Sequence, residues 1–334
     1  MENTVILSHG GGGDKTNELI TTIFASHFAN PLITHDDAAV LPIGDTRLAF
    51  TTDGFIVSPL FFPGGNIGTL SVCGTVNDLA CMGAKPLWLS AAFVLEEGFP
   101  LHDLSVIAES MAAAAKKAGV AIVCGDTKVA SKGQVDKVFI TTSGIGRLDT
   151  SITLSGDNAQ DGDIVLVTGD IGRHGATILV AREEFGIEAS VTSDCAPLAD
   201  LVQSLLAQSS DIHCIRDATR GGVGTVLYEI CAQSSVGMTI TANDIPVDPA
   251  VGAITAMLGL DPLYLACEGR MVIIAKASSR DLLLQTLHSH PLGTKAAVIG
   301  RITKEYPGQI LVETPLGAKT RLQKPTGELL PRIC

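Results

Sequence analysis

The chain has 334 residues, of which 35 are acidic and 23 are basic, and its formal net charge is −12. This acidic balance argues against broad contact with a nucleic-acid backbone, and an aromatic content of 4% argues against stacking platforms for bases. No run of about 18 apolar residues predicts a membrane span, and the opening segment lacks the basic and apolar regions of a secretory signal. We therefore expect a cytoplasmic protein that binds neither nucleic acid nor membrane, with about two domains at roughly 150 residues each.

The first half of the chain alternates helical and strand patterns. Apolar periodicity predicts helices over 17–28, from a cap at Asn66 to a stop at Gly83, and from Leu104 to Gly119. Strands are predicted over 46–52, 87–95, 121–124 and 137–143. A polar, glycine-rich stretch over 149–163 predicts the domain boundary.

The second half also mixes both kinds of element. Helices are predicted over 175–185, 198–208, 222–234, 248–258 and 279–288, and strands over 163–168, 236–241, 271–276, 296–302 and 309–313. The expected fold is therefore two α/β domains, over 1–155 and 156–320, followed by a tail over 321–334.

Eight cysteines are present, and no two of them form a CxxC pair. In a chain of this length such spacing indicates reduced thiols rather than a disulfide framework. Cys73, Cys81 and Cys124 are expected to pack in the core, and Cys124 to be buried at a strand end. Cys334 differs because it is the last residue of the sequence. Its position alone leaves open the alternative that this terminal cysteine has no function.

A run of four glycines stands directly before the first helical pattern. Successive glycines let backbone N–H groups approach a phosphate, and the start of a helix favours that anion. A P-loop is excluded because Asp14 separates the glycines from Lys15 and no strand precedes them. Two interpretations of this segment remain open. It is either an N-terminal loop without function or a phosphate-covering loop formed by Gly10, Gly11, Gly12 and Gly13.

Four segments carry aspartates in chain order, namely HDDAAV, TTDGF, TVNDLACMGAKP and CGDTKV. Aspartates next to strand ends suit a hard cation, and Mg²⁺ combines a few protein oxygens with phosphate oxygens. Any one of these aspartates also suits an ordinary cap or turn. Together they predict a magnesium–nucleotide site whose candidate metal ligands are Asp36, Asp37, Asp53, Asp78 and Asp126.

These segments resemble the ATP-binding half of the aminoimidazole-ribonucleotide synthetase-like superfamily, and TGDIGRHG, RDATRGGVG and ACEGRMVI resemble its second half. The terminal PRIC narrows the resemblance to the carbamoyl dehydratases of nickel–iron hydrogenase maturation. The resemblance covers essentially the whole chain. It implies two α/β domains and a homodimer joined through its N-terminal sheets, with ATP near the interface.

The resemblance also implies roles for individual residues. Mg²⁺ and ATP would be held by Asp37, Asp53, Asp78 and Asp126, with the glycines of 10–13 covering the phosphates. Lys128 would neutralise the transferred phosphoryl group, and Glu268 would accept a proton. The cleft would be lined in the second half by three further nucleotide-binding residues, His174, Asp217 and Arg220.

The implied reaction takes place on Cys334. A partner carbamoyltransferase would load this cysteine, ATP would phosphorylate the carbamoyl oxygen, and loss of a proton and of phosphate would leave a thiocyanate. The cyanide would then pass to iron on a scaffold complex. Fourteen residues from Arg321 span at most about 45–50 Å, so the tail is expected to move between cleft and solvent, with ATP favouring the inward state.

Two alternatives remain open. One is another ATP-dependent enzyme of the superfamily, such as a small-molecule kinase or a selenophosphate synthetase. The absence of a cysteine before Cys73 counts against the synthetase. The other is a scaffold that holds a metal through Cys334 and senses ATP. ATP turnover without Cys334 would favour the kinase, and metal retention without chemistry on Cys334 would favour the scaffold.

Overall fold

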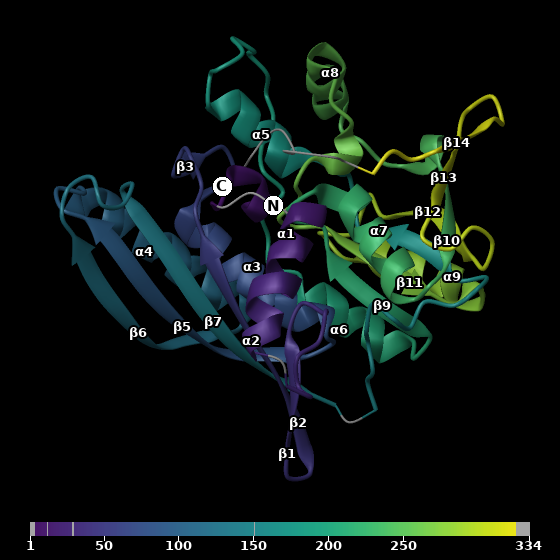
Figure 1. The fold of residues 1–334 in the computed structure, drawn as a ribbon, viewed down its shortest axis with the longest axis horizontal. Helices are drawn as coiled ribbons and strands as arrows, with labels where there is room; N and C mark the ends of the chain where they lie inside the picture. The colour runs from purple at the N-terminus through teal and green to yellow at the C-terminus, as the bar shows by residue number, and fades with distance from the viewer. Residues whose placement is uncertain (1–3, 12, 29, 150, 325–334) are drawn as a thin grey trace.

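The computed structural model describes residues 4–11, 13–28, 30–149 and 151–324. It contains two α/β domains, each built on one sheet, as the sequence predicts (Figure 1). The segment over 325–334, which carries Cys334, lies outside the described residues. Within the described ranges, no helix combines the length and the apolarity needed to cross a membrane.

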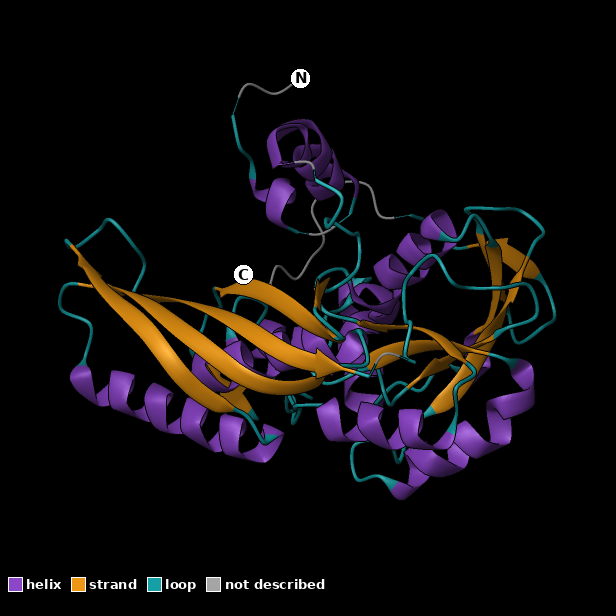
Figure 2. Cartoon of the chain, turned by 90° about the horizontal axis from the view of Figure 1, so that it is seen from below, coloured by secondary structure: helices purple, strands orange, loops and turns teal. Residues whose placement is uncertain are grey.

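The N-terminal domain has a five-stranded sheet in the order β1-β2-β7-β5-β6, in which only β5 and β6 pair in parallel. Helices lie against one face of this sheet (Figure 2). The strands are β1 (Ala39–Ile43), β2 (Thr46–Phe55), β5 (Lys85–Glu96), β6 (Ala121–Ala130) and β7 (Val138–Leu148), and the helices are α3 (Ile67–Cys81) and α4 (Leu101–Ala118). A two-stranded ribbon, β3 (Phe61–Phe62) with β4 (Gly65–Asn66), leads into α3.

Helix α3 lies at the centre of the molecule. It begins where predicted, because the Asn66 side chain accepts the N–H groups of Gly68 and Thr69 at 2.9 and 3.2 Å. It ends before Gly83, which adopts a φ of +78°. The residues of the helix itself are apolar or small on nearly every side, and almost all of them are buried, as expected for a helix enclosed by the core. It packs against β2 and β7 of its own domain and against α6 and β9 of the other.

The C-terminal domain has a seven-stranded sheet in the order β14-β13-β10-β12-β8-β11-β9. Its strands are β8 (Ile164–Val167), β9 (Ile212–Asp217), β10 (Gly237–Thr241), β11 (Met271–Ala275), β12 (Ala297–Thr303), β13 (Ile310–Glu313) and β14 (Lys319–Arg321). Its helices are α5 (Arg173–Ala181), α6 (Ala199–Gln208), α7 (Gly222–Gln233), α8 (Pro249–Leu258) and α9 (Arg280–Ser289), with short 3₁₀ turns that include η4 (Pro262–Tyr264). The largest apolar core contains residues of both domains, from α3 and β5 to β11 and α9.

The N-terminal residues form a helical segment set apart from both sheets (Figure 2). A 3₁₀ turn, η1 (Leu7–Gly10), is followed by α1 (Asp14–Leu19), a π-helical stretch η2 (Ile20–Ala25) and α2 (Ser26–Phe28). Helical structure therefore begins at Asp14, three residues before the predicted start at residue 17.

Several predictions about the elements were incomplete or wrong. Five strands of the described residues were not predicted, namely β1, β3, β4, β9 and β14. The strand predicted over 121–124 continues to Ala130, so Asp126 lies inside β6 rather than after it. Cys124 is exposed, not buried. The reason is that β6 is the edge strand of its sheet, and every residue of it except the last is exposed.

Candidate functional site

A cleft of about 750 Å³ lies between the two domains and the N-terminal helical segment. Its walls come from α1, β2, α3, the end of β9 and the length of α7. Most of the candidate residues meet here, although they are far apart in the sequence. The candidates that line the cleft are Gly13, Asp36, Asp37, Asp53, Asp78, His174, Asp217, Arg220 and Glu268.

Carboxylates from three segments of the chain converge in this cleft. Asp37, two residues before β1, and Asp217, the last residue of β9, place side-chain oxygens within 4.8 Å of each other and of the Cys81 sulfur. Asp78, on the last turn of α3, accepts the Thr51 hydroxyl at 2.9 Å. They converge because α3 packs against both β2 and β9.

The pKa values of these carboxyls are raised. Burial raises the pKa of Asp37 to about 6, against the opposing charge of Arg216, and raises the pKa of Asp217 to about 8. Burial, and then the charge of Asp217, hold the pKa of Asp78 well above its usual value. Arg216 opposes only part of the repulsion among these buried carboxyls, so they retain protons. A divalent cation would relieve this repulsion and displace the protons.

The available donors fit Mg²⁺. Asp37 Oδ2 is buried without a hydrogen-bond partner among the described residues, so it has a free oxygen for a cation. Oxygen ligands are those that a hard cation prefers. Burial keeps the pKa of the Cys81 thiol well above its usual value, so the thiol is neutral and a poor ligand for such an ion.

The two neighbouring aspartates have different partners. Asp36 accepts the Ser155 hydroxyl at 2.9 Å and the Gly156 N–H at 2.9 Å, so it ties the first strand region to the start of the second domain. Asp37 instead pairs with Arg216, whose Nε lies 2.9 Å from Asp37 Oδ1. Of the two, Asp37 has the side chain in the carboxylate cluster.

Asp53 and Arg220 also line the cleft. Asp53 is on β2 and accepts the N–H of Gly54 at 2.8 Å. Burial raises the pKa of Asp53, and the nearby charge of Arg220 opposes this rise. Arg220 is exposed, in the turn between β9 and α7. A carboxylate beside an exposed guanidinium in the cleft suits a charged ligand that enters from solvent.

Asp126 and Lys128 do not line this cleft. They form an exposed ion pair on β6, with Lys128 Nζ 2.9 Å from Asp126 Oδ2. The Lys128 hydrogen bond and charge lower the pKa of Asp126. The pairing register puts β7 and β5 between Asp53 and Asp126, a separation of about 14 Å at roughly 4.8 Å per strand.

The glycines are placed unequally. Gly10 ends the 3₁₀ turn η1 and Gly11 follows it, whereas Gly12 lies outside the described residues. Gly13 caps α1 with a φ of +83° and lines the cleft. This positive φ is one that glycine adopts at little cost.

His174 and Glu268 are both buried at the cleft. The pKa of His174 is lowered to about 3 by burial, so its ring is neutral. Its Nδ1 lies 2.8 Å from Ser193 Oγ, and its Nε2 has no partner among the described residues. Glu268 holds Asp194 through its backbone N–H, which donates to Asp194 Oδ1 at 3.2 Å. Burial, and then the charge of Asp217, raise the pKa of Glu268 well above its usual value.

Sequence reasoning missed three residues of this region. Cys81 was expected to be core filler, and it is buried, but it lies with Asp37 and Asp217. Its position three residues after Asp78 on one helix was the available signal. Arg216, next to Asp217, and Tyr228, on α7, also line the cleft. Nothing in their local sequence marks them, because their contacts are with distant segments.

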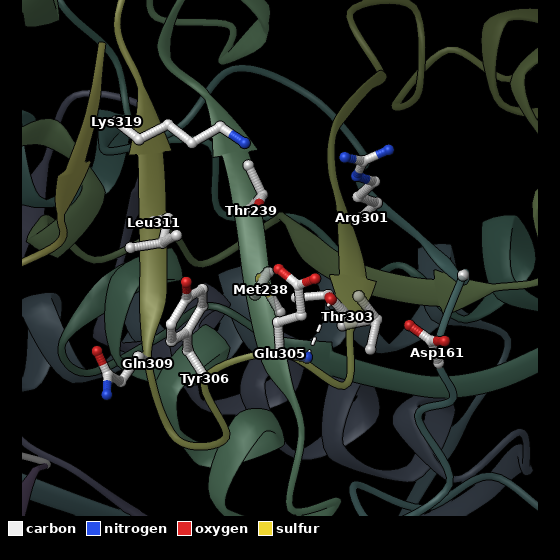
Figure 3. A pocket seen from close by; sticks show the side chains of 12 residues that line it. Asp161, Met238, Thr239, Arg301, Thr303, Glu305, Tyr306, Gln309, Leu311 and Lys319 are labelled. Atoms are coloured by element: carbon white, nitrogen blue, oxygen red, sulfur yellow. Dashed lines mark hydrogen bonds between the residues drawn. The ribbon is translucent and has the colours of Figure 1, made fainter.

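A second hollow lies on the C-terminal sheet, over β10, β12, β13 and β14 (Figure 3). Arg301, Lys319 and Glu305 are among its lining residues. All the charged side chains that line it are exposed. It therefore lacks the buried, converging ionisable groups of the cleft between the domains.

Residues 35–148 match the N-terminal domain of AIR synthase related proteins, and residues 160–313 match their C-terminal domain. Fold and cleft thus define a two-domain protein of the AIR synthase related class. The chain is 47% identical to carbamoyl dehydratase HypE of Azotobacter vinelandii, over 99% of this chain and 97% of that protein. It is 44% identical to carbamoyl dehydratase HypE of Escherichia coli K12, over 99% and 100%. The chain belongs to the HypE family of carbamoyl dehydratases.

Solved structures agree with this assignment. The structure of a HypE–HypF complex contains a chain with a TM-score of 0.88 and 45% identity, covering 92% of this chain and 99% of that one. HypE in complex with ATP gives a TM-score of 0.83 and 43% identity, covering 99% and 100%. The family resemblance predicted from the motifs is thereby confirmed.

Proposed function

We propose that this chain catalyses the ATP-dependent dehydration of a carbamoyl group on Cys334 to a thiocyanate, which supplies cyanide ligands for the iron of nickel–iron hydrogenase. The observation that carries the proposal is the convergence of Asp37, Asp78, Asp217 and Glu268 in one cleft of a HypE-family chain. A HypE has been crystallised with ATP and another with HypF, which supports a nucleotide in this cleft and a carbamoyl-supplying partner.

ATP would bind with its phosphates toward the carboxylate cluster. Asp37, Asp53, Asp78 and Asp217 would hold Mg²⁺, which supplies positive charge against the phosphate oxygens when bound. Gly13 and the N-terminal end of the helical segment 14–28 would present backbone N–H groups to the phosphates. Arg220 would contact the nucleotide at the mouth of the cleft.

In the first step the carbamoyl oxygen of the Cys334 thiocarbamate attacks the γ-phosphorus of ATP. An O–P bond forms, ADP leaves, and one N–H proton departs from the nitrogen. In the second step the C–O bond breaks, phosphate leaves with the bonding electron pair, and the remaining N–H proton is taken up, which leaves S–C≡N. Glu268 is the proposed proton acceptor, because a carboxylate with a raised pKa is a stronger base once it is ionised.

His174 would orient the reacting group. Its neutral ring has a nitrogen without a partner, and it lines the cleft together with Glu268. A neutral donor next to a carbamoyl oxygen or nitrogen can fix its direction without adding charge.

We propose that the protein is a homodimer joined through β6. This edge strand exposes Ile122, Val123 and Val129, which are 39%, 59% and 68% exposed. An uncapped edge with apolar side chains favours pairing with a second copy. Asp126 and Lys128 are on the same strand, so they would reach the nucleotide only in the assembled dimer, where Lys128 would neutralise the transferred phosphoryl group.

The remaining assignments are inferred from the membership of the chain in the HypE family. A HypF-like carbamoyltransferase would load Cys334, and an iron-carrying scaffold of the HypC–HypD kind would receive the cyanide. The protein would act in the cytoplasm. The boundaries 1–155, 156–320 and 321–334 stand as proposed limits of the ATP-binding domain, the C-terminal domain and the tail.

The decisive experiment uses protein carbamoylated on Cys334. It is incubated with Mg–ATP, and the mass of its C-terminal peptide is followed. The mass should fall by one water, and a Cys334→Ala variant should show no adduct. A mass that never falls below that of the carbamoylated peptide would exclude the dehydratase. ATP turnover that persists in Cys334→Ala with a free small molecule would favour a kinase, and metal retention without a mass change would favour a scaffold.

A further inference from the structure

The last described residues of the chain are held against the cleft. Leu322 is buried in the apolar core of the C-terminal domain, and its N–H donates to Ile310 O at 2.9 Å. Lys324 lines the cleft and forms an ion pair with Asp14 at the start of α1. The base of the tail is therefore fixed at the rim of the cleft, next to the N-terminal helical segment.

Two tyrosines hold two consecutive carbonyls at this point. The Tyr228 hydroxyl donates to Leu322 O, and the Tyr264 hydroxyl donates to Gln323 O, each at 2.5 Å. The Lys324 ammonium lies 6.0 Å from the centre of the Tyr228 ring. Two donors from different elements, α7 and η4, fix the orientation of two successive peptide planes. They thereby fix the path of residues 322–324 next to the cleft.

Two glycines in the first turn of α7 make room for this pair. A Cβ on Gly224 would lie 2.4 Å from Cε1 of Tyr264, so only glycine lets that ring pack against the helix. A Cβ on Gly222 would lie 2.5 Å from Leu265 O. Tyr228 follows Gly224 by four residues and so lies one turn further along the same side of α7. The sequence RGGVG thus brings Tyr264 next to Tyr228.

We propose that Tyr228 and Tyr264 are positioning residues that aim the C-terminal tail at the cleft, so that the Cys334 carbamoyl group is delivered at high effective concentration. The inference rests on the proposed dehydration of that group. Ten residues follow Lys324, which can span at most about 33–36 Å. For a tethered substrate, the direction of the tether sets the local concentration at the site. The hydroxyls act on the backbone of 322–323 and on no reacting atom.

The test compares a tethered with a free substrate. The tethered assay measures single-turnover dehydration of the carbamoylated Cys334 in Tyr264→Phe. The free assay adds a synthetic carbamoylated peptide of residues 325–334 to full-length Cys334→Ala, with and without Tyr264→Phe. Loss of one hydrogen bond should slow the tethered reaction about 2- to 10-fold. The free reaction and ATP affinity should not change.

Matched variants complete the design. Tyr306→Phe removes the hydroxyl of the remaining tyrosine, which lies in the hollow on the outer sheet, and should leave both rates unchanged. Gly224→Ala should displace the Tyr264 ring and slow the tethered reaction more than Tyr264→Phe does. Equal losses of rate in the tethered and the free assay would overturn the proposal. A tethered rate that is unchanged in both Tyr264→Phe and Gly224→Ala would overturn it as well. If the proteins that retain Tyr264 and Gly224 failed in both assays, the proposed dehydratase function would be overturned instead.

Discussion

Nδ1 of His174 lies 2.8 Å from Ser193 Oγ, and the same oxygen accepts the N–H of Cys195 at 3.1 Å. The serine hydroxyl can donate its proton to Nδ1, and in that tautomer the imidazole proton lies on Nε2. That nitrogen is buried and has no partner among the described residues. In this tautomer His174 presents a neutral N–H donor at the cleft.

The first prediction concerns the pH dependence of stability. The pKa of His174 is about 3 in the folded chain and 6.5 as a free side chain. Between these values the unfolded chain binds the extra proton, so stability falls as pH drops below about 6.5, by up to about 1.4 kcal/mol per pH unit. In His174→Gln this contribution should be missing. Urea unfolding of both proteins at pH 7, 6 and 5 checks it, and parallel losses of stability in the two proteins would contradict it.

The second prediction concerns Asp217 without metal. Its pKa is raised from 3.8 to about 8 in the folded chain, so the folded chain binds the extra proton between those values. Its contribution to stability is therefore present below pH 4 and is lost as pH rises toward 8, by up to about 1.4 kcal/mol per pH unit. Asp217→Asn in EDTA should flatten this slope and raise the melting temperature at pH 8.

The same variant should lose its response to metal. Mg–ATP should raise the melting temperature of the unmodified protein at pH 8 and affect Asp217→Asn much less, because a carboxylate oxygen is replaced by an amide. Asp36→Asn is the control, since its oxygens are bound to Ser155 and Gly156 rather than in the cluster. If Asp36→Asn abolished the Mg–ATP response while Asp217→Asn retained it, the assignment of ligands would be reversed.

A third prediction separates chemistry from binding at Glu268. Glu268→Gln keeps the size of the side chain but removes the proton acceptor, so single-turnover dehydration should slow by about 100-fold or more. ATP affinity should stay within about threefold, because the side chain is not among the proposed metal ligands. Rapid quench with mass analysis of the C-terminal peptide measures the rate, and titration calorimetry measures the affinity. A rate within tenfold of the unmodified protein would assign the base elsewhere.

The fourth prediction concerns the edge strand β6. Val123 is 59% exposed, and Val123→Glu should place a charge in the proposed dimer interface and shift the protein toward monomer. Activity should fall in parallel, because Lys128 would no longer reach a nucleotide. Leu316→Glu is the control, since this residue is 96% exposed in a turn of the other domain. Light scattering after size-exclusion chromatography gives the mass, and an unchanged dimer in Val123→Glu would place the interface elsewhere.

Local sequence was sufficient where a feature depends on neighbours in the chain. The cap at Asn66 and the stop at Gly83 could be predicted because both rely on backbone groups within a few residues. The boundaries of α6 and α8 agree with their predicted ranges to within about one residue for the same reason.

Local sequence was insufficient where a feature depends on the sheet or on distant contacts. Cys124 has an apolar neighbourhood, but its exposure follows from the place of β6 at the sheet edge. The GDT segment looks like those of the other aspartates, yet pairing order leaves Asp126 three strands from Asp53. Tyr228 and Tyr264 acquire their partners, Leu322 and Gln323, only when the chain has folded back across α7.

The apolar core that joins the two domains limits how the cleft can exchange its contents. Ile67 and Leu89 of one domain and Ile273 of the other belong to a single buried cluster, with at most 1% of each residue exposed. Separating the domains would bring this surface into water at a cost of about 25 cal/mol per Å². A nucleotide bound in the cleft would therefore enter and leave past the rim, where the N-terminal helical segment and Lys324 lie, while the floor of the cleft would stay closed.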